Sequence, residues 1–498
     1  MLKKIVFLCA LIASCGQVFS QTSQESPAET GSQEIVFEPQ FFSSSRKTYG
    51  VPVHEDNDGK KHYFSAIAGM LAPEVAIGLW CRYAIEAGWA QVGWDNLANP
   101  LEKTLECDDD WLWTNFVLHP FQGSLYYMAA RNSNLNRIEA MGLTALGDII
   151  WEFFFETTKP SVNDLVYSFF GGFAVGEMMY RLSLEAEQYQ LAFGYLLNPS
   201  RILTETLTRQ KPRGTIGNIY DVSITFHVGT MHSYTKSGYS GVQSEVENFP
   251  VYFSPDITII YNDPYGHDSN DPYSQFEFRF GAGLGKGSGV WRGMIDAEKY
   301  LMYDVFIFSN GMLFSRAPDF GENKDTTIGM VLDYDFRWHS LIDLAALSPG
   351  FAIKQRISYE KSRIEWQAHL GWNMIGITDY YYFHRDPTMT TSTGRDYSYF
   401  TGLESVFMWK WVTKKGFAIE SNIHAYAGRD FSIQRLPGQS GGWEVFGFCE
   451  LNLEKAVSPI VRLGLSNTLY LKGAFYDTVE DVFQIAYSGG AYVKLQLN

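Results

Sequence analysis

Apolar and polar residues alternate along most of the carboxyl-terminal half of the chain, and this period of two constrains the fold more than any other feature. In one run, Phe276, Phe278 and Phe280 alternate with Glu277 and Arg279. Successive side chains of a β-strand point to opposite faces of its sheet, so such a run predicts a strand with one apolar and one polar face. About a dozen runs of this kind follow one another up to the last residue.

The length of these runs distinguishes two architectures. Strands of a soluble β-sandwich usually have about 5–6 residues, whereas about 9–11 residues cross a bilayer at a tilt. The runs here are of the longer kind, and aromatic residues gather near their ends at 378–383, 396–400 and 407–411, where outer-membrane barrels carry aromatic girdles. We therefore predict a transmembrane antiparallel β-barrel of about 12 strands over residues 206–498, with a soluble sandwich or an unusual barrel as the alternative.

Residues 61–205 are expected to form an all-α block, which makes the whole chain α+β in arrangement. Their apolar residues come in helix-length blocks separated by Pro, Gly and Asn, and Ser161 with Asp164 resembles a helix N-terminal cap. Every block contains an acid or a proline, such as Pro73 and Glu74 in the first, so no transmembrane helix is expected.

The start of the chain resembles a secretory signal peptide, which we expect over residues 1–20. Two lysines precede an apolar run at 5–13 that is too short to span a bilayer. Cleavage after Ser20 is one alternative, and lipidation at Cys15 is the other. Export with a barrel predicts the outer membrane of a Gram-negative-type (diderm) bacterium, with outer-membrane lipid and the barrel assembly machinery as partners.

Residues 21–60 are rich in Ser, Gln, Glu and Asp and predict a disordered linker. After the signal peptide three cysteines remain, Cys81, Cys107 and Cys449, without metal-like spacing. They are expected to be isolated buried thiols, with a Cys81–Cys107 disulfide as the alternative.

The chain is acidic, with 55 Asp and Glu against 39 Lys and Arg and a formal net charge of −16. Nucleic-acid binding depends on clusters of Lys and Arg that neutralise phosphates, and the sequence has none. A nucleic-acid partner is therefore not expected.

Three stretches between 108 and 183 carry a specific resemblance. Their motifs are W-x-T-N-x-x-x-H-P-x-x-G-S-x-Y from Trp113, W-E-x-x-x-E from Trp151, P-S-x-N-D-L from Pro160 and G-E-x-x-x-R-L-S from Gly176. This part of the chain resembles a bacterial family of uncharacterised outer-membrane proteins, known only as a domain of unknown function. Because the activity of that family is unknown, the resemblance implies fold and compartment rather than chemistry.

Charged residues within these motifs are the candidate structural or binding network. Glu177 and Arg181 are four residues apart and are expected to form an ion pair on one helix face. Glu152 and Glu156 have the same spacing but repel each other, so we expect them to meet Arg131 and Arg181. A buried network of this kind, holding apolar helices together, is the leading interpretation.

A catalytic site is the second interpretation, with a metal site as a weaker third. The candidate catalytic residues, of types found in hydrolases, are His119, Glu152, Glu156, Ser161 and Asp164. His119, Glu152 and Glu156 would supply the metal ligands, but this spacing is a weak signal, and we expect no metal. No cofactor-binding fingerprint with the right context is present, so no cofactor is expected.

The leading functional prediction is an outer-membrane β-barrel protein with a helical domain in the periplasm or in the barrel lumen. Its role would be non-enzymatic, in transport, binding or envelope structure, with a ligand that the sequence does not identify. The alternative is an outer-membrane hydrolase or transferase that acts on lipid or envelope polysaccharide.

Overall fold

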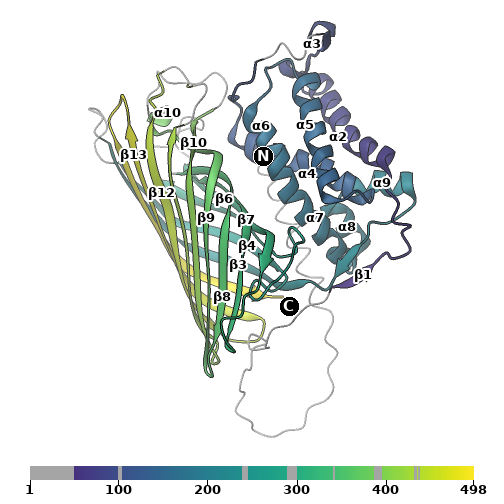
Figure 1. Ribbon diagram of the computed structural model, residues 1–498. Helices are drawn as coiled ribbons and strands as arrows, with labels where there is room; N and C mark the ends of the chain where they lie inside the picture. Colours follow the sequence, from purple (N-terminus) through teal and green to yellow (C-terminus); the bar gives the residue numbers. More distant parts are fainter. Residues whose placement is uncertain are drawn as a thin grey trace.

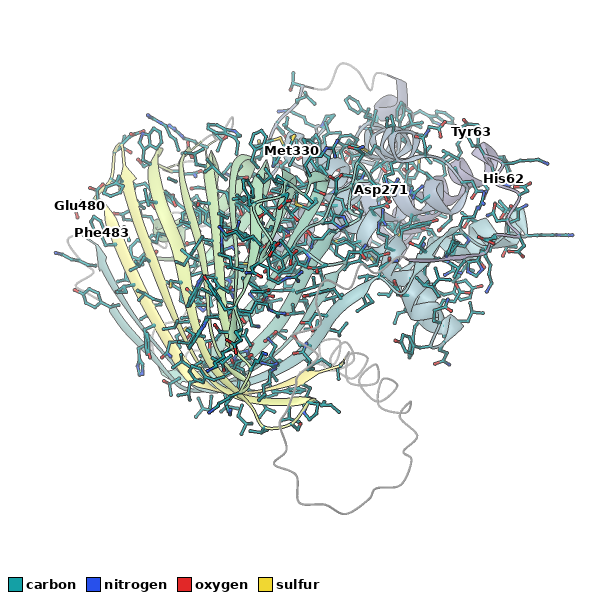
Figure 2. All side chains as sticks on the ribbon, turned by 60° about the horizontal axis from the view of Figure 1, so that its bottom comes forward. His62, Tyr63, Asp271, Met330, Glu480 and Phe483 are labelled. Carbon is teal, nitrogen blue, oxygen red and sulfur yellow. The ribbon has the colours of Figure 1, made fainter. Side chains whose placement is uncertain are left out.

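The computed structural model describes residues 50–98, 104–237, 245–288, 300–339, 342–385, 395–430, 435 and 438–497. These residues form a helical bundle and a β-barrel, which lie side by side in both views of the whole chain (Figures 1 and 2). The predicted signal peptide lies outside the described residues. Of the expected linker at 21–60, the described part includes a short strand, β1 (Val51–Val53), which pairs with β2 (Gly214–Ile216).

Twelve antiparallel strands close into a barrel in which each strand pairs with its neighbours in sequence and the last pairs with the first. The fold class predicted from the sequence is thus confirmed. The strands are β3 (Ile219–Ser237), β4 (Glu245–Tyr261), β5 (Phe276–Ser288), β6 (Tyr300–Arg316), β7 (Lys324–His339), β8 (Asp343–Ser358), β9 (Ser362–Asp379), β10 (Tyr397–Thr413), β11 (Phe417–Asp430), β12 (Gly442–Ala456), β13 (Val461–Tyr476) and β14 (Val482–Gln496).

The alternation along each strand places apolar side chains on the outer wall of the barrel and polar side chains in its lumen. On β13, Leu469 and Leu471 are exposed on the outside, whereas Tyr470 and Lys472 are buried inside. An outward apolar surface removes the cost of placing a strand in hydrocarbon, and closure leaves no unpaired strand edge. The wall is therefore suited to a lipid bilayer.

The connections distinguish the two ends of the barrel. At one end most connections are short, such as 359–361 and 414–416, with 262–275 as the exception, whereas the other end includes the longer segments 380–396 and 431–441. Outer-membrane barrels have short periplasmic turns and longer extracellular loops. We therefore call the first end, where β3 begins and β14 ends, the periplasmic end, and the second the extracellular end.

The helical bundle precedes the barrel. Its helices and tighter or wider helical turns are α2 (Tyr63–Tyr83), η2 (Gly88–Ala90), α3 (Trp94–Ala98), η4 (Thr114–Leu118), α4 (His119–Asn132), α5 (Arg137–Ile150), η5 (Trp151–Phe155), α6 (Val162–Val166), η6 (Tyr167–Gly171), α7 (Gly172–Glu187), α8 (Leu191–Leu197) and α9 (Ser200–Thr208). A further short helix, α10 (Tyr381–Arg385), lies between β9 and β10. No disulfide forms among the described cysteines.

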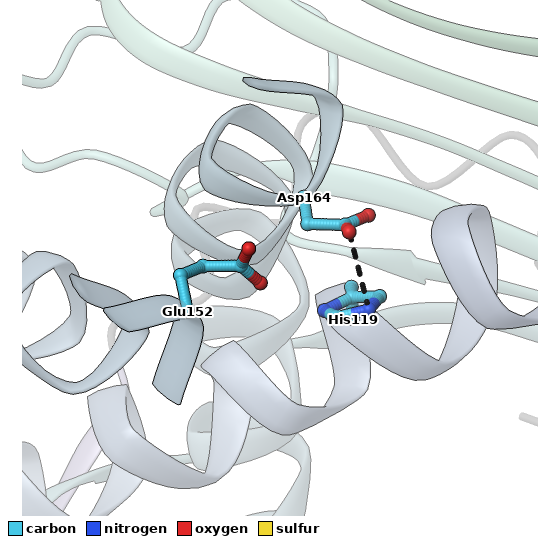
Figure 3. Close-up of side chains that lie close together, drawn as sticks. All are labelled: His119, Glu152 and Asp164. Carbon is cyan, nitrogen blue, oxygen red and sulfur yellow. Dashed lines mark ion pairs between the residues drawn. The ribbon is translucent and has the colours of Figure 1, made fainter. Parts of the chain in front are cut away.

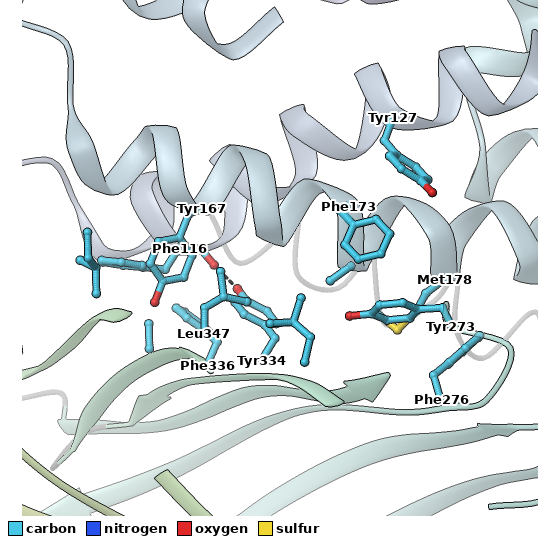
Figure 4. Close-up of a cluster of buried hydrophobic side chains, with 14 of the residues drawn as sticks. Phe116, Tyr127, Tyr167, Phe173, Met178, Tyr273, Phe276, Tyr334, Phe336 and Leu347 are labelled. Carbon is cyan, nitrogen blue, oxygen red and sulfur yellow. Dashed lines mark hydrogen bonds between the residues drawn. The ribbon is translucent and has the colours of Figure 1, made fainter. Parts of the chain in front are cut away.

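The bundle packs against the outer surface of the barrel wall. On β7, Asp333 and Asp335 point inward, since they bind the luminal side chains of His369 and His424. The intervening Tyr334 points outward, and its hydroxyl donates to a backbone carbonyl of η4. Figure 4 shows this interface, with aromatic side chains from the helices above and from the strands below.

This arrangement corrects two expectations. The helical domain does not occupy the lumen, so the luminal alternative is wrong. In addition, Tyr397 and Tyr399, within one of the expected girdle segments, are fully buried against the bundle, where they pack beside Phe116. A side chain that faces outward has the same sequence pattern whether lipid or a helix covers it.

Candidate functional site

Three of the candidate catalytic residues converge in the bundle. His119 begins α4, Glu152 lies in η5 and Asp164 lies in α6, and one ligand-type atom of each falls within 4.8 Å of the others. Figure 3 shows the two carboxylates pointing toward the imidazole. His119 Nε2 lies 3.6 Å from Asp164 Oδ2. All three side chains are buried.

Asp108, which precedes the first helical turn of this region, extends the group. Its carboxylate accepts hydrogen bonds from the side-chain amides of Asn115 and Asn163, and Tyr399 donates its hydroxyl to the Asp108 carbonyl. We call Asp108, His119, Glu152 and Asp164 the acid cluster. It lies near the extracellular end, because Tyr399 is close to the extracellular end of β10.

Glu156 departs from the expected arrangement. η5 is a π-helical turn that ends at Phe155, and Glu156 follows it in an extended conformation. The i, i+4 rule therefore does not place Glu152 and Glu156 on one helix face. The Glu156 carboxylate instead accepts hydrogen bonds from Trp151 and Thr158.

Ser161 caps α6 through its hydroxyl. Its oxygen accepts a hydrogen bond from Asp164 N, and it donates to Asn163 Oδ1. The hydroxyl beside the imidazole belongs to Ser168, whose Oγ lies 3.3 Å from His119 Nδ1. No sequence motif pointed to Ser168, because η6 brings it to His119 through a π-helical turn.

The Ser161 cap gives a direct prediction. Ser161→Ala removes the side-chain acceptor for Asp164 N and is expected to lower the free energy of unfolding by about 1 kcal/mol. The urea midpoint of the helical CD signal measures this, with Ser161→Thr as the control that keeps a capping oxygen. Equal midpoints for the alanine and threonine variants would contradict the capping role.

The acid cluster is electrostatically unfavourable. Burial raises the pKa of the Asp164 carboxyl well above its usual range, and the charges of Asp108 and Glu152 raise it further. Burial, with Glu156 nearby, does the same to the pKa of Glu152. Burial also lowers the pKa of His119 to about 4, against the opposing charge of Asp108. An added positive charge would stabilise the ionised forms of the Glu152 and Asp164 carboxyls.

Arg131 and Arg181 do not reach the acid cluster. Both bind Glu177, at 3.0 Å each, and Arg137 joins them at 3.1 Å. The expected Glu177–Arg181 pair is thus confirmed, whereas the expectation that these arginines meet Glu152 and Glu156 is wrong. Arg137 and Arg181 also pair with Asp271 in the connection between β4 and β5, which ties the bundle to the periplasmic end.

The Glu177 network predicts an acid-sensitive bundle. Burial alone would raise the pKa of Glu177, but Arg131, Arg181 and Arg137 lower it from 4.5 to about 2. The stabilisation is thus complete above about pH 4.5 and is lost as the pH falls toward 2. We expect the difference in urea midpoint between wild type and Glu177→Gln to shrink over this interval. A difference that stays constant from pH 6 to pH 3 would contradict the assignment.

Inside the barrel, buried polar contacts cross the extracellular half of the lumen. Lys472 pairs with Asp379 at 2.9 Å and with Glu444 at 3.0 Å. The Arg337 guanidinium lies 4.3 Å from the centre of the Phe448 ring and donates to the Tyr470 hydroxyl. We call these contacts, together with Asp333–His369 and Asp335–His424, the luminal plug.

The periplasmic half of the lumen contains a cavity of about 520 Å³. Seven carboxylates and five Lys or Arg side chains line it, and most of these face a partner of opposite sign. Lys410 pairs with Glu420 at 3.0 Å, and His227 approaches Asp256 at 2.9 Å. The cavity therefore presents both signs of charge.

A closed barrel with an apolar outer wall and a polar, partly hollow lumen defines an outer-membrane β-barrel protein. Residues 104–199 match the model of a family described as a domain of unknown function (DUF3943). This match confirms the resemblance that the motifs carried for the helical part of the chain. No curated protein matches the chain at a significant level.

Solved structures similar to this chain include three outer-membrane proteins. The COG4313 outer membrane channel from Pseudomonas putida F1 is 10% identical, with a TM-score of 0.30, over 55% of this chain and 95% of that one. The P. putida toluene transporter TodX is 8% identical, with a TM-score of 0.24, over 56% and 90%. The Escherichia coli outer membrane protease OmpT is 7% identical, with a TM-score of 0.21, over 56% and 97%.

Proposed function

We propose that this protein is a gated outer-membrane transport and binding barrel for a small polar solute. The observation that carries the proposal is the division of the lumen into a cavity in the periplasmic half and a plug of buried contacts in the extracellular half. Passage of a solute would require the plug to rearrange. Wide porins reach an open aqueous channel with 16–18 strands, and this barrel has fewer.

The cavity wall indicates the class of solute. Because both carboxylates and cations line it, a molecule that carries both charges would find partners for each, whereas a molecule with a single charge would meet repulsion as well. A small zwitterionic solute is therefore the proposed cargo.

Conductance in planar bilayers tests the closed lumen. The purified, folded wild-type protein is expected to pass no sustained current in potassium chloride, because buried ion pairs span its lumen. A steady current with the step size of an open general porin would contradict the proposal.

The same proposal includes the route to the membrane. Export by the signal peptide at 1–20, assembly by the barrel assembly machinery and contact with outer-membrane lipid fit a barrel of this design. The absence of Lys and Arg clusters continues to favour no nucleic-acid partner.

A hydrolase of lipid or envelope polysaccharide is a second candidate, favoured by one observation. Ser168, His119 and Asp164 are arranged in the order of a nucleophile, a base and an orienting acid. However, Ser168 is only 1% exposed, so a substrate would need the bundle to open. Ser168→Ala with unchanged membrane lipid and polysaccharide composition would contradict this candidate.

A further inference from the structure

We propose that the acid cluster binds a divalent first-row transition-metal ion through His119, Glu152 and Asp164. His119 Nε2 and Asp164 Oδ2 are 3.6 Å apart, which is longer than a hydrogen bond. It is close to the roughly 3.3 Å that separates two ligands of a tetrahedral zinc ion with bonds of about 2.0–2.1 Å. The imidazole nitrogen and the carboxylate oxygen are therefore already separated by about the distance between two ligands of one metal ion.

One carboxylate oxygen of the acid cluster, Glu152 Oε1, is without a hydrogen-bond partner among the described residues. Glu152 Oε2 accepts a hydrogen bond from Ser161 N, but Oε1 has no partner within the described part of the chain, although Glu152 is only 1% exposed. Leaving a buried carboxylate oxygen unsatisfied costs on the order of 1–3 kcal/mol. Figure 3 shows this carboxylate pointing toward the imidazole and the Asp164 carboxylate. A cation between them would occupy the unpaired oxygen.

No protein cation takes that place. Within the described ranges, no Lys or Arg makes an ion pair with Glu152 or Asp164, since Arg131, Arg137 and Arg181 all bind Glu177. Buried carboxylates either take up protons or bind a cation. The acid cluster therefore meets the charge requirement of a metal site.

The surrounding contacts orient the ligands. Ser168 Oγ lies beside His119 Nδ1 and leaves Nε2 for a metal, the arrangement common among metal-ligating histidines. Asn115 and Asn163 hold the Asp108 carboxylate in place within the acid cluster. One imidazole and two carboxylates favour a transition-metal ion over Ca²⁺, which prefers oxygen ligands alone.

Metal content tests this site. The detergent-purified full-length protein, incubated with Zn²⁺ or Mn²⁺ and desalted, is expected to retain about one ion per chain. Glu152→Gln and Asp164→Asn should each lower the affinity at least tenfold, whereas Glu156→Gln, just after the turn that carries Glu152, is the matched control and should retain the ion. A wild-type protein without bound metal, or an equal loss in the Glu156 variant, would overturn the proposal.

Thermal unfolding gives a second readout that separates ligation from a folding defect. Without metal, Glu152→Gln and Asp164→Asn should raise the melting temperature, because they remove buried repulsion. With Zn²⁺ in excess, the order should reverse, since the wild type gains more stability from the ion than either variant does. Variants that melt below the wild type to the same extent in both conditions would show a structural role only.

Helix α2 lies in the layer of the bundle away from the barrel (Figure 1). His62 and Tyr63, at its start, stand at the far edge from the strands in Figure 2. Contrary to the sequence expectation, α2 is long and apolar enough to cross a membrane. Its acid, Glu74, is fully buried inside the bundle. Its exposed positions are Tyr63, Phe64, Ile67, Ala72, Val75, Ala76, Leu79, Trp80 and Tyr83, and none is charged.

The direction and length of α2 fit a bilayer. At the start of α2, the His62 backbone amide donates a hydrogen bond to the Ser133 carbonyl. Ser133 lies just before Arg137 in the chain, and Arg137 pairs with Asp271 at the periplasmic end. At its other end α2 packs against η5, which carries Glu152 of the acid cluster near the extracellular end. A helix of 21 residues is about 31 Å long, close to the ~30 Å hydrocarbon core.

The structure assigns outer-membrane acyl chains to this face of α2. The bundle covers part of a wall whose uncovered residues face lipid, so the lipid surface continues from the barrel onto the bundle. Aromatic residues stand at both ends of the exposed face, as at membrane interfaces. The exposed residues of neighbouring α5, namely Ile138, Gly142, Leu146 and Ile149, are also uncharged.

Spin labels in proteoliposomes test the assignment. In a Cys449→Ser background, labels at Val75→Cys and Leu79→Cys should collide more with oxygen than with a water-soluble nickel complex. A label at Lys61→Cys, just before the helix, should show the opposite. High nickel accessibility at Val75 and Leu79 would overturn lipid contact in favour of water, and low accessibility to both reagents would overturn it in favour of a second protein copy.

Discussion

Replacing Glu177 with glutamine is expected to lower the stability of the helical bundle by about 3–5 kcal/mol. Glu177 is fully buried and binds the guanidinium groups of Arg131, Arg137 and Arg181. Glutamine has nearly the same shape but no charge, so the three cations would lose their shared partner. Removing one member of a buried charged group costs far more than the intact group contributes.

The urea dependence of the helical CD signal measures this loss. Glu139 provides the control in the same domain, because its ion pair with Lys61, at 2.7 Å, is partly exposed. Glu139→Gln is expected to cost less than about 1 kcal/mol. Similar decreases in the free energy of unfolding for both variants would contradict the larger stabilisation expected from the buried Glu177 network.

Opening the luminal plug is expected to convert a silent barrel into a conducting one. Arg337 and Tyr470 meet across the lumen, and both are buried among aromatic rings. The double variant Arg337→Ala, Tyr470→Ala removes two long side chains from the plug while the strand pairing is kept. We expect discrete current steps in planar bilayers where the wild type shows none.

The matched control for this variant lies on the same strand. Leu469→Ala and Leu471→Ala remove similar bulk from the outer face of β13, and the lumen should stay closed. Current steps in the control would indicate a disturbed barrel, and a silent Arg337, Tyr470 variant with normal heat-modifiable migration would contradict the role of the plug.

The barrel was predictable because alternation over long runs is a local property of the sequence. Glu277 and Arg279 on β5 point inward and the intervening Phe278 outward, as the pattern required. The Glu177–Arg181 pair and the Ser161 cap were predictable for the same reason, since each joins residues within one helical turn.

The position of the bundle was not predictable in this way. Tyr399 on the outer wall has the same pattern whether it faces lipid or Asp108, so only the tertiary structure separates the two. The composition of the acid cluster was missed for a different reason. The π-helical turns η5 and η6 change the helical period locally, which turns Glu156 away and brings Ser168 to His119.

The central claim is that the helical bundle lies on the outer wall of a membrane-inserted barrel. Photo-crosslinking with p-benzoylphenylalanine in place of Trp338 tests it directly, because Trp338 faces outward and packs against Trp113. The same group in place of Leu403, which is exposed on the outer wall, is the control. We expect an intramolecular crosslink from position 338 to residues 111–118 and crosslinks from position 403 to lipid. Crosslinks to lipid from both positions would contradict this claim.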